Sequence, residues 1–260
     1  MAGMSISEEP ATSFGRVADS YDKVRPGPLP GAVDWLLPAG CQVAVDLAAG
    51  TGLFTRAIAA RVPQVTAIEP DQRMRDVLAR RSPGVRVLAG TAEEMPLPDC
   101  WADAVLVSTA WHWFDPERAV PEIARVLKDG GRLAIVWTSR DRDPDWVAEL
   151  DILRNGEAPE PQAIAEVRAY LERHHSVTLP AGAQFGTPEV TSFSSSRTLS
   201  VPDTLDWVAT NSRFITAPPE DREARLVRLR AALVKRSGDS GLVDMPVRSW
   251  CWRATRLPRC

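Results

Sequence analysis

The sequence contains few residues that bind metals or form disulfides. Its 260 residues include four cysteines and three histidines. No two cysteines form a C-x-x-C pair, and no Cys/His group has the spacing of a zinc site. We therefore expect no metal site. Free thiols are typical of a reducing compartment, so we predict a cytoplasmic protein.

Long apolar runs and a strong net charge are also missing. No apolar run approaches the ~18 residues that cross a bilayer. Residues 1–13 contain no apolar core of a signal peptide, so we expect none. The formal net charge of −3 is too small to favour nucleic acid or an anionic membrane as a partner. We expect a small-molecule partner, and a monomer or a homodimer.

What the sequence does contain is an alternation of strands and helices typical of α/β proteins. Short apolar runs alternate with amphipathic stretches from residue 42 to 138, which indicates a parallel sheet covered on both faces. The expected strands are 42–47, 65–69, 85–89, 102–108, 132–137, 188–199 and 247–255. The expected helices are 14–24, a short one around 33–37, 53–61, 72–81, 116–127, 144–154, 161–173, 202–210 and 219–236.

These elements predict a fold class and a domain organisation. We predict an α/β, Rossmann-like, doubly wound, mostly parallel seven-stranded sheet with helical insertions after strands five and six. Residues 1–40 would form a tail and cover helices, and residues 41–138 a ligand-binding core. Residues 139–187 would be a helical insertion. Residues 188–260 would complete the sheet, with a second helical insertion at about 201–241.

The turn after the first expected strand carries the strongest chemical signal. It reads Asp46-Leu47-Ala48-Ala49-Gly50-Thr51-Gly52. Gly50 and Gly52 permit a tight turn and let a ligand lie against bare backbone. The N–H groups at the start of the following helix favour a polar or negative ligand group. A tight turn without any ligand is the alternative interpretation.

Two details separate possible ligands of this turn. A dinucleotide fingerprint requires a third glycine, and Thr55 occupies that position. A pyrophosphate would also gain nothing from Asp46 at the end of the strand. A ligand with an ammonium group and a sulfonium would gain from that carboxylate.

The second expected strand also ends on acidic residues. Glu69 lies about 20 residues beyond the glycine turn, where a carboxylate accepts hydrogen bonds from ribose hydroxyls. Pro70 follows it. Asp71 precedes the expected helix 72–81 and suits the helix N-cap. We therefore assign Glu69 to a ribose and Asp71 to the helix.

The D-x-x-A-G-T-G segment resembles motif I of class I S-adenosylmethionine (SAM)-dependent methyltransferases. Residues 89–98 resemble the G-x-A-E-x-L-P segment of the same family, with Met95 at the Leu position. The resemblance implies SAM as cofactor and adenine contacts from Ala92 and Glu93. The alternative for residues 89–98 is a plain surface loop.

The segment after the fourth strand resembles a branch of this family that includes trans-aconitate methyltransferase-like enzymes. Ser108 is followed by Thr109-Ala110-Trp111-His112-Trp113-Phe114-Asp115, similar to A-x-H-W-F-D. Ser108 would contact the cofactor, and Trp111 and Trp113 would line the acceptor pocket, because aromatic faces attract a sulfonium and exclude water. Core packing is the alternative for at least one aromatic residue.

His112 is the candidate catalytic residue. Imidazole titrates near neutral pH and could remove a proton from an acceptor hydroxyl or amine. A structural histidine is an equally good interpretation, because a carboxylate acceptor needs no base. Trp137 ends the fifth expected strand, and we predict that it also lines the acceptor pocket.

Two further segments complete the set of candidate residues. The pattern F-x-x-x-A-x-x-Y-x-x-x-R-P at the N-terminus resembles the same branch and implies that Tyr21 and Arg25 approach the cofactor's carboxylate. His174-His175 follows Arg173 and has no metal-ligand partner at suitable spacing. We interpret it as a solvated helix end.

The favoured function is methyl transfer from SAM to a small molecule. Oxygen, as carboxylate or hydroxyl, is favoured over nitrogen or carbon as the acceptor atom. The absence of an N/D-P-P-Y/F motif after the fourth strand argues against methylation of nucleobase amino groups. Two alternatives stay open: an NAD-linked oxidoreductase, and a SAM-binding regulator without catalysis.

Overall fold

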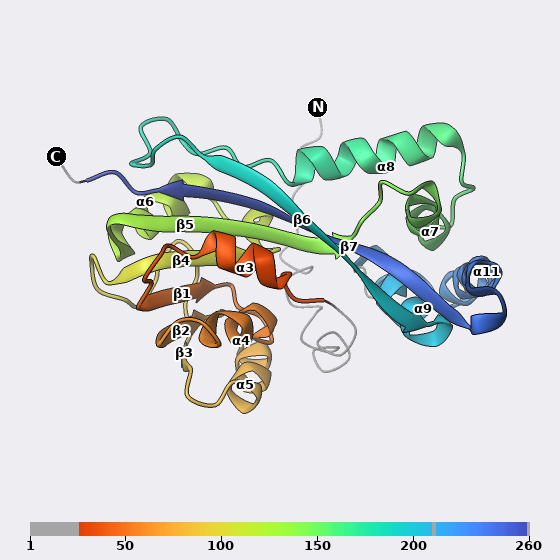
Figure 1. The fold of residues 1–260 in the computed structure, drawn as a ribbon, viewed down its shortest axis with the longest axis horizontal. Coiled ribbons are helices and arrows are strands. Elements are labelled where there is room, and N and C mark those ends of the chain that lie inside the picture. Colours follow the sequence, from red (N-terminus) through yellow and green to blue (C-terminus); the bar gives the residue numbers. More distant parts are fainter. Residues whose placement is uncertain (1–25, 210–211, 259–260) are drawn as a thin grey trace. The chain divides into compact units, whose positions relative to one another are not determined.

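The computed structural model describes residues 26–209 and 212–258, which include a seven-stranded sheet with helices packed on it (Figure 1). The strand order is β3-β2-β1-β4-β5-β7-β6. The strands are β1 (Val43–Leu47), β2 (Gln64–Ile68), β3 (Arg86–Leu88), β4 (Ala102–Ser108), β5 (Leu127–Arg140), β6 (Glu189–Ser200) and β7 (Leu242–Thr255).

Five neighbouring strands run in the same direction. β1 pairs in parallel with β2 and β4, β2 pairs in parallel with β3, and β4 pairs in parallel with β5. β7 pairs antiparallel with β5. The carboxyl ends of β1, β2 and β4 therefore lie at one edge of the sheet, which is where open α/β sheets bind ligands.

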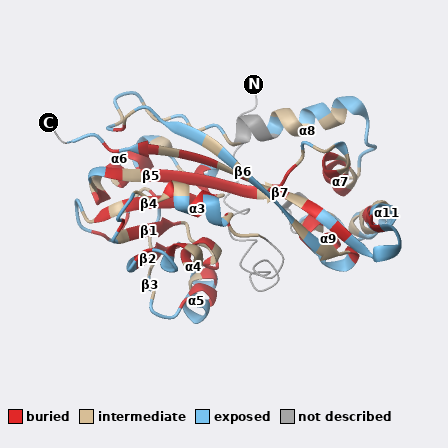
Figure 2. Ribbon diagram, viewed as in Figure 1, coloured by how far each residue is buried: buried red, intermediate tan, exposed pale blue. Residues whose placement is uncertain are grey.

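Helices cover both faces of the parallel strands. They are α3 (Pro30–Leu36), α4 (Leu53–Ala59), α5 (Gln72–Arg81) and α6 (Pro116–Val126). Side chains alternate along β1: Val45 and Leu47 pack with α6, whereas Ala44 packs with α3 and α4. Figure 2 shows the buried positions following the strands and the inner sides of these helices. This two-sided burial explains the near-continuous apolar runs of the strands.

The chain divides into two compact units. The larger contains the parallel strands and, of the described residues, 26–141, 168–197 and 245–258. Among the described residues, the smaller unit comprises 142–167, 198–209 and 212–244. Its helices are α7 (Asp145–Asn155), α9 (Val201–Ala209), α10 (Ser212–Ile215) and α11 (Pro219–Ser237); α8 (Pro161–His174) contributes to both units. In the smaller unit, buried Asp151 forms ion pairs with Arg142 and Arg154.

The predicted fold class is confirmed, and several elements match closely. α5 and β4 have the predicted bounds. Asp71 caps α5 as predicted, because its side chain accepts a hydrogen bond from the Arg73 N–H. The predicted insertions after strands five and six are helical, and α10 is an additional helix. The predicted helix 14–24 lies outside the described residues.

Two strand predictions were too short. β5 begins at Leu127, five residues before the predicted start at 132, and so contains the Gly130-Gly131 pair. Its pairing with β4 shifts register: Ala102 pairs with Leu127, but Ala104 pairs with Arg132. The extra residues of β5 form a bulge in this stretch. It includes Gly130, whose φ of 75° is a conformation that glycine adopts readily. β7 also begins earlier than predicted, at Leu242.

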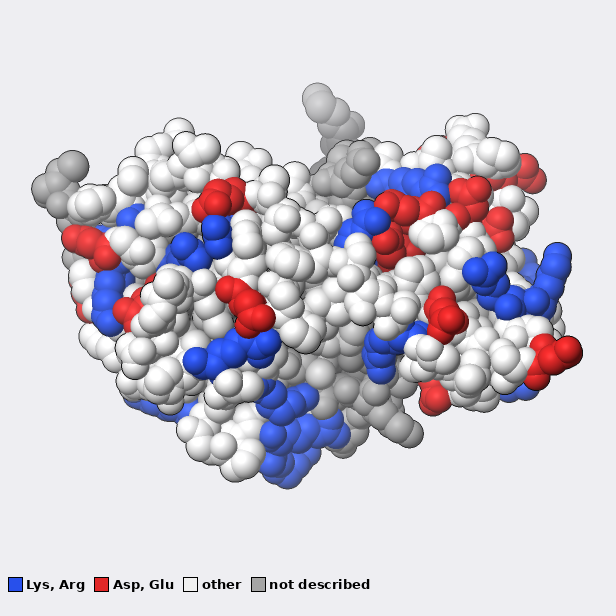
Figure 3. Space-filling model, viewed as in Figure 1, with Lys and Arg blue, Asp and Glu red and all other residues white. Residues whose placement is uncertain are grey.

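Acidic and basic side chains are interspersed over most of the face seen in Figure 3, but basic side chains gather over α5. α5 carries four arginines. Two of them are engaged locally: Arg73 pairs with Asp71, and Arg75 donates to the Glu69 carbonyl. In the part of the chain that the structure describes, no helix combines the length and apolar character needed to cross a bilayer.

Candidate functional site

The glycine turn after β1 is built from backbone conformations that favour glycine. Gly50 and Gly52 have φ values of 57° and 85°. A Cβ on Gly52 would stand 2.9 Å from Leu78 Cγ and 3.1 Å from Ser82 Oγ, so α5 packs directly on this glycine. A Cβ on Gly50 would meet nothing within 4 Å. Gly52 is therefore required for packing, whereas Gly50 leaves open space beside the turn.

Asp46 is a buried carboxyl with one oxygen lacking a partner. It is 1% exposed. Thr55 Oγ1 donates to its Oδ2 at 2.5 Å, but Oδ1 is enclosed and has no hydrogen-bond partner in the described chain. Burial raises the pKa of Asp46 to about 7, and the nearby Glu69 carboxyl adds to the rise. A cationic ligand group at Oδ1 would relieve this cost.

Glu69 joins the turn to the end of β2. Its Oε2 accepts from the Gly50 N–H at 2.8 Å, and its Oε1 accepts from the Asp71 N–H at 3.0 Å. Burial raises the pKa of Glu69, while these two backbone hydrogen bonds lower it. A carboxylate has about four acceptor positions, so capacity remains for two hydroxyls. Pro70, beside it, is exposed.

The segment that follows β3 is clamped onto α6. Ala92 is buried, and Glu93 Oε1 accepts from the Asp115 N–H at 3.0 Å. Glu122 Oε1 accepts from the Met95 N–H at 2.7 Å, and Arg125 Nη1 donates to the Leu97 carbonyl at 2.8 Å. These contacts fix the backbone next to Ala92 and Glu93. This clamp was not predicted from the sequence, because no spacing rule connects the two segments.

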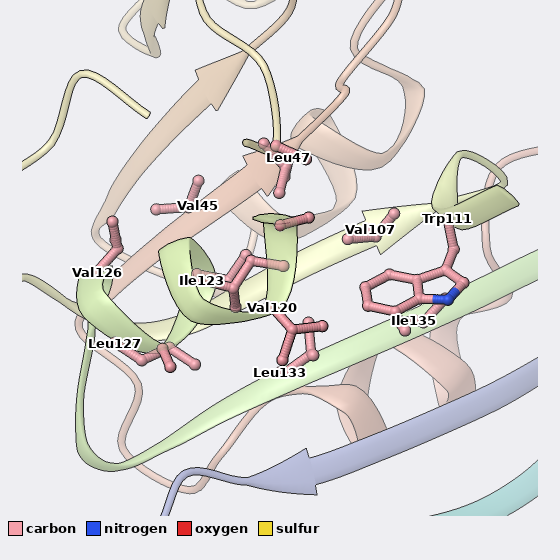
Figure 4. Packing of buried hydrophobic residues seen from close by; sticks show 14 of the residues in the cluster. Val45, Leu47, Val107, Trp111, Val120, Ile123, Val126, Leu127, Leu133 and Ile135 are labelled. Atoms are coloured by element: carbon pink, nitrogen blue, oxygen red, sulfur yellow. The ribbon is translucent and has the colours of Figure 1, made fainter. Parts of the chain in front are cut away.

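The chain leaves β4 at Ser108, which is partly buried, and forms a short 3₁₀ helix, η2 (Trp111–Trp113). Trp111 is 6% exposed and lies in the hydrophobic core, where its indole extends toward Ile135 of β5 (Figure 4). Trp113 is 49% exposed. His112 is exposed and its ring lies 4.7 Å from that of Trp113. The structure therefore separates a core tryptophan from an exposed His–Trp pair.

Trp137 lies two residues beyond Ile135 on the same face of β5, where it meets His175. Trp137 is 2% exposed, and its ring centroid lies 5.3 Å from that of His175. The interpretation of His175 as part of a solvated helix end was wrong, because its ring packs against Trp137 and Trp250. Sequence offers no signal for this contact, which depends on where the chain after α8 returns to the sheet.

Two predicted residues fall outside the described part of the chain, and two surface hollows lie away from the predicted site. Tyr21 and Arg25 lie outside the described residues. One hollow of about 210 Å³ borders Gly40 and Lys128, and another of about 430 Å³ borders Pro121 and Gly182. Neither is lined by a residue predicted for the site.

The site therefore gathers Asp46, Gly50 and Glu69 at the carboxyl ends of β1 and β2: Glu69 is hydrogen-bonded to Gly50, and the Glu69 carboxyl is close enough to Asp46 to raise its pKa. Comparison with known proteins agrees with this geometry. The sequence profile of a methyltransferase domain matches residues 45–135. An uncharacterized methyltransferase of Mycobacterium tuberculosis is 40% identical over 248 residues, covering 94% of this chain and 95% of the relative. The chain belongs to the class I SAM-dependent methyltransferases.

Other relatives of the methyltransferase support the same assignment. An uncharacterized methyltransferase-like protein of Schizosaccharomyces pombe is 33% identical over 216 residues, covering 81% of this chain and 80% of the relative. The solved structure of a candidate type II methyltransferase from Anaeromyxobacter dehalogenans has a TM-score of 0.66 at 22% identity. It covers 90% of this chain and 99% of its own, and it supports the fold.

Proposed function

We propose that this methyltransferase binds SAM against the turn after β1 and transfers its methyl group to an oxygen of a small molecule. The observation that carries the proposal is the enclosed Oδ1 of Asp46, an acceptor without a partner in the described residues. The α-ammonium group of SAM suits that oxygen in charge and hydrogen-bonding capacity. The open space beside Gly50 suits a ligand lying against the backbone.

The remaining cofactor contacts follow from the same edge of the sheet. Glu69 would accept from the ribose hydroxyls, with Pro70 beside it. Ala92 and Glu93 would contact the adenine, and the contacts of Glu122 and Arg125 would hold that segment in place. Ser108 would contact the cofactor at the end of β4. Ala48 and Gly52 would shape the turn, and Tyr21 and Arg25 would approach the cofactor's carboxylate.

A bound SAM supplies a methyl group on a cationic sulfur. A lone pair of the acceptor oxygen forms the new C–O bond as the C–S electron pair returns to sulfur, leaving S-adenosylhomocysteine. A hydroxyl acceptor must also lose a proton, and exposed His112 is our candidate base for that case. A carboxylate acceptor needs no base. The protein's main contribution is then alignment of the two reactants and exclusion of water, worth ~7 kcal/mol or more.

Transfer of radiolabelled methyl groups from SAM tests this function. The full-length protein is incubated with small carboxylic acids, phenols and amines, and organic-soluble label is counted before and after mild alkali. We expect label on at least one oxygen acceptor, with alkali-labile label identifying a methyl ester. Label found only on amines would contradict the oxygen assignment. Tight SAM binding without any transfer would favour a non-catalytic regulator.

The three described cysteines, Cys41, Cys100 and Cys251, are free thiols. Burial raises the pKa of Cys41 to about 11 and that of Cys251 to about 12, so both thiols stay protonated and unreactive at neutral pH. We accordingly propose that the enzyme works in the reducing cytoplasm.

A further inference from the structure

Three aromatic side chains meet where β5 and β7 pair. Trp137 and Trp250 are directly opposite each other in the antiparallel ladder, so they share one face of the sheet. The His175 ring lies 5.3 Å from the Trp137 ring and 4.5 Å from the Trp250 ring, tilted by 35° and 37°. We call Trp137, His175 and Trp250 the β5–β7 aromatic cluster.

The cluster lies at the level where β4 leaves the sheet. Ser108, the last residue of β4, pairs with Val136 of β5. The Thr109 N–H then donates to the Val136 carbonyl at 2.8 Å. Trp137 is the next residue of β5 and so stands beside the start of the segment that forms η2. This is the carboxyl edge of the parallel strands, where the acceptor of a methyl group would approach the cofactor.

Trp137 has a polar group that the described chain leaves unsatisfied. Its Nε1 is enclosed, and no acceptor for it lies in residues 26–209 or 212–258. Indole nitrogen only donates hydrogen bonds, and a buried donor without an acceptor costs about 1–3 kcal/mol. An oxygen atom of a ligand entering the cluster would recover that cost.

The surrounding groups define what such a ligand should be. The neighbouring His175 imidazole carries at least one N–H donor, as every imidazole does. The Arg248 guanidinium stands 5.8 Å over the Trp250 ring, held by an ion pair of 2.7 Å with Asp141. Two N–H donors favour an anionic oxygen. Aromatic faces favour a flat, conjugated group in contact with them.

We propose that the β5–β7 aromatic cluster binds the methyl acceptor, and that this acceptor is a conjugated carboxylate or phenolate. One oxygen accepts from Trp137 Nε1 and from His175, and the flat part of the molecule lies against Trp250. The proposal rests on the proposed function, because it assigns the acceptor side of the same site. It makes His175 an acceptor-binding residue, although the sequence pattern had predicted a solvated helix end there.

Nuclear magnetic resonance of the full-length protein saturated with S-adenosylhomocysteine tests this proposal. The tryptophans are labelled with ¹⁵N, and benzoate, benzylamine and benzamide serve as probes of equal size and different charge. We expect benzoate to shift the Trp137 indole signal saturably, and benzylamine to leave it in place. His175→Gln should weaken benzoate binding about ten-fold, as expected for losing one hydrogen bond to a charged group.

Matched variants keep the result interpretable. Trp35 lies on α3, and its indole packs under the guanidinium of Arg253. Trp35→Phe removes that indole and should leave the benzoate response of Trp137 unchanged. Loss of a peak in Trp137→Phe assigns the Trp137 indole signal. Because Trp137 is buried and this variant could fail to fold, contacts between the indole proton and the β5 amide protons provide a second assignment. A benzylamine response equal to that of benzoate would overturn the proposal. So would a benzoate affinity reduced by His112→Gln but not by His175→Gln.

Calorimetry with S-adenosylhomocysteine separates this proposal from the one on which it rests. If the nucleoside binds but benzoate does not move the Trp137 signal, the cluster is not the acceptor site, and the cofactor assignment stands. If the nucleoside does not bind at all, both proposals fail.

Discussion

Replacing Asp46 by asparagine should stabilise the free enzyme while weakening its binding of SAM. The Asp46 carboxyl is almost fully buried, and burial raises its pKa to about 7 from an ordinary 3.8. Asparagine has nearly the same shape, and its carbonyl can still accept from the Thr55 hydroxyl. It carries no charge to desolvate, but it also cannot pair with an ammonium group.

The magnitude follows from proton linkage. Between about pH 4 and pH 7 the folded state holds a proton on Asp46 that the unfolded state has released. Stability from this carboxyl is therefore present at low pH and is lost as the pH rises to about 7. Three pKa units at about 1.4 kcal/mol each give about 4 kcal/mol at pH 8, an upper limit because the site can relax. Asp46→Asn should regain up to that amount.

Urea unfolding at a series of pH values measures the effect. The informative quantity is the difference in unfolding free energy between Asp46→Asn and the natural protein, since other titrating groups cancel in it. We expect a difference near zero at pH 4 that grows in favour of the variant up to about pH 7. Calorimetry on the same samples should show SAM affinity reduced by about 100-fold, as for a lost charge-assisted hydrogen bond.

Asp71→Asn provides the control with the opposite sign. The hydrogen bond and charge of Arg73 lower the pKa of Asp71, so its stabilising effect is present at neutral pH and is lost as the pH falls. This variant should be slightly less stable at pH 8. A variant at Asp46 that is no more stable than the natural protein at pH 8 would refute the burial argument. Unchanged SAM affinity would refute the assignment of Asp46 to the ammonium.

Three further predictions follow from the site. Gly52 has a φ of 85° and packs closely against α5, so Gly52→Ala should lower the free energy of unfolding by about 2 kcal/mol. Gly50→Ala should lower it by about 1 kcal/mol. Urea unfolding measures both values. SAM affinity should fall about ten-fold per pH unit below the Asp46 pKa of about 7, because the ammonium group pairs with the ionised carboxylate. Calorimetry in buffers of different ionisation enthalpy should then show a proton released on binding. Arg125→Lys breaks the fork that holds the segment after β3 and should raise KM for SAM about ten-fold with little change in kcat, measured in steady-state assays.

The parallel core could be predicted from the sequence because its signals are local. Apolar runs define the buried strands, and Asp71 marks the start of α5 by its capping bond. The turn chemistry likewise located Asp46, Gly50 and Glu69, since strand ends in a parallel sheet meet at one edge. The strand order alone is therefore enough to predict that these three residues lie close together.

The parts that escaped prediction depend on contacts between distant segments. Thr55 was noted only as a missing glycine, yet its hydroxyl faces Asp46 across the turn. His175 meets Trp250 from 75 residues away in sequence. β5 was predicted too short because a glycine pair usually marks a turn, and here it sits inside a strand. Trp111 and Trp113 look alike in sequence, but only Trp113 is exposed.

Titration calorimetry of the purified enzyme with SAM and, separately, with NAD tests the central claim most directly. The account predicts saturable binding of SAM that Asp46→Asn and Glu69→Gln each weaken by at least about ten-fold, and no binding of NAD. Saturable binding of NAD without SAM would contradict it, as would SAM binding that neither substitution affects.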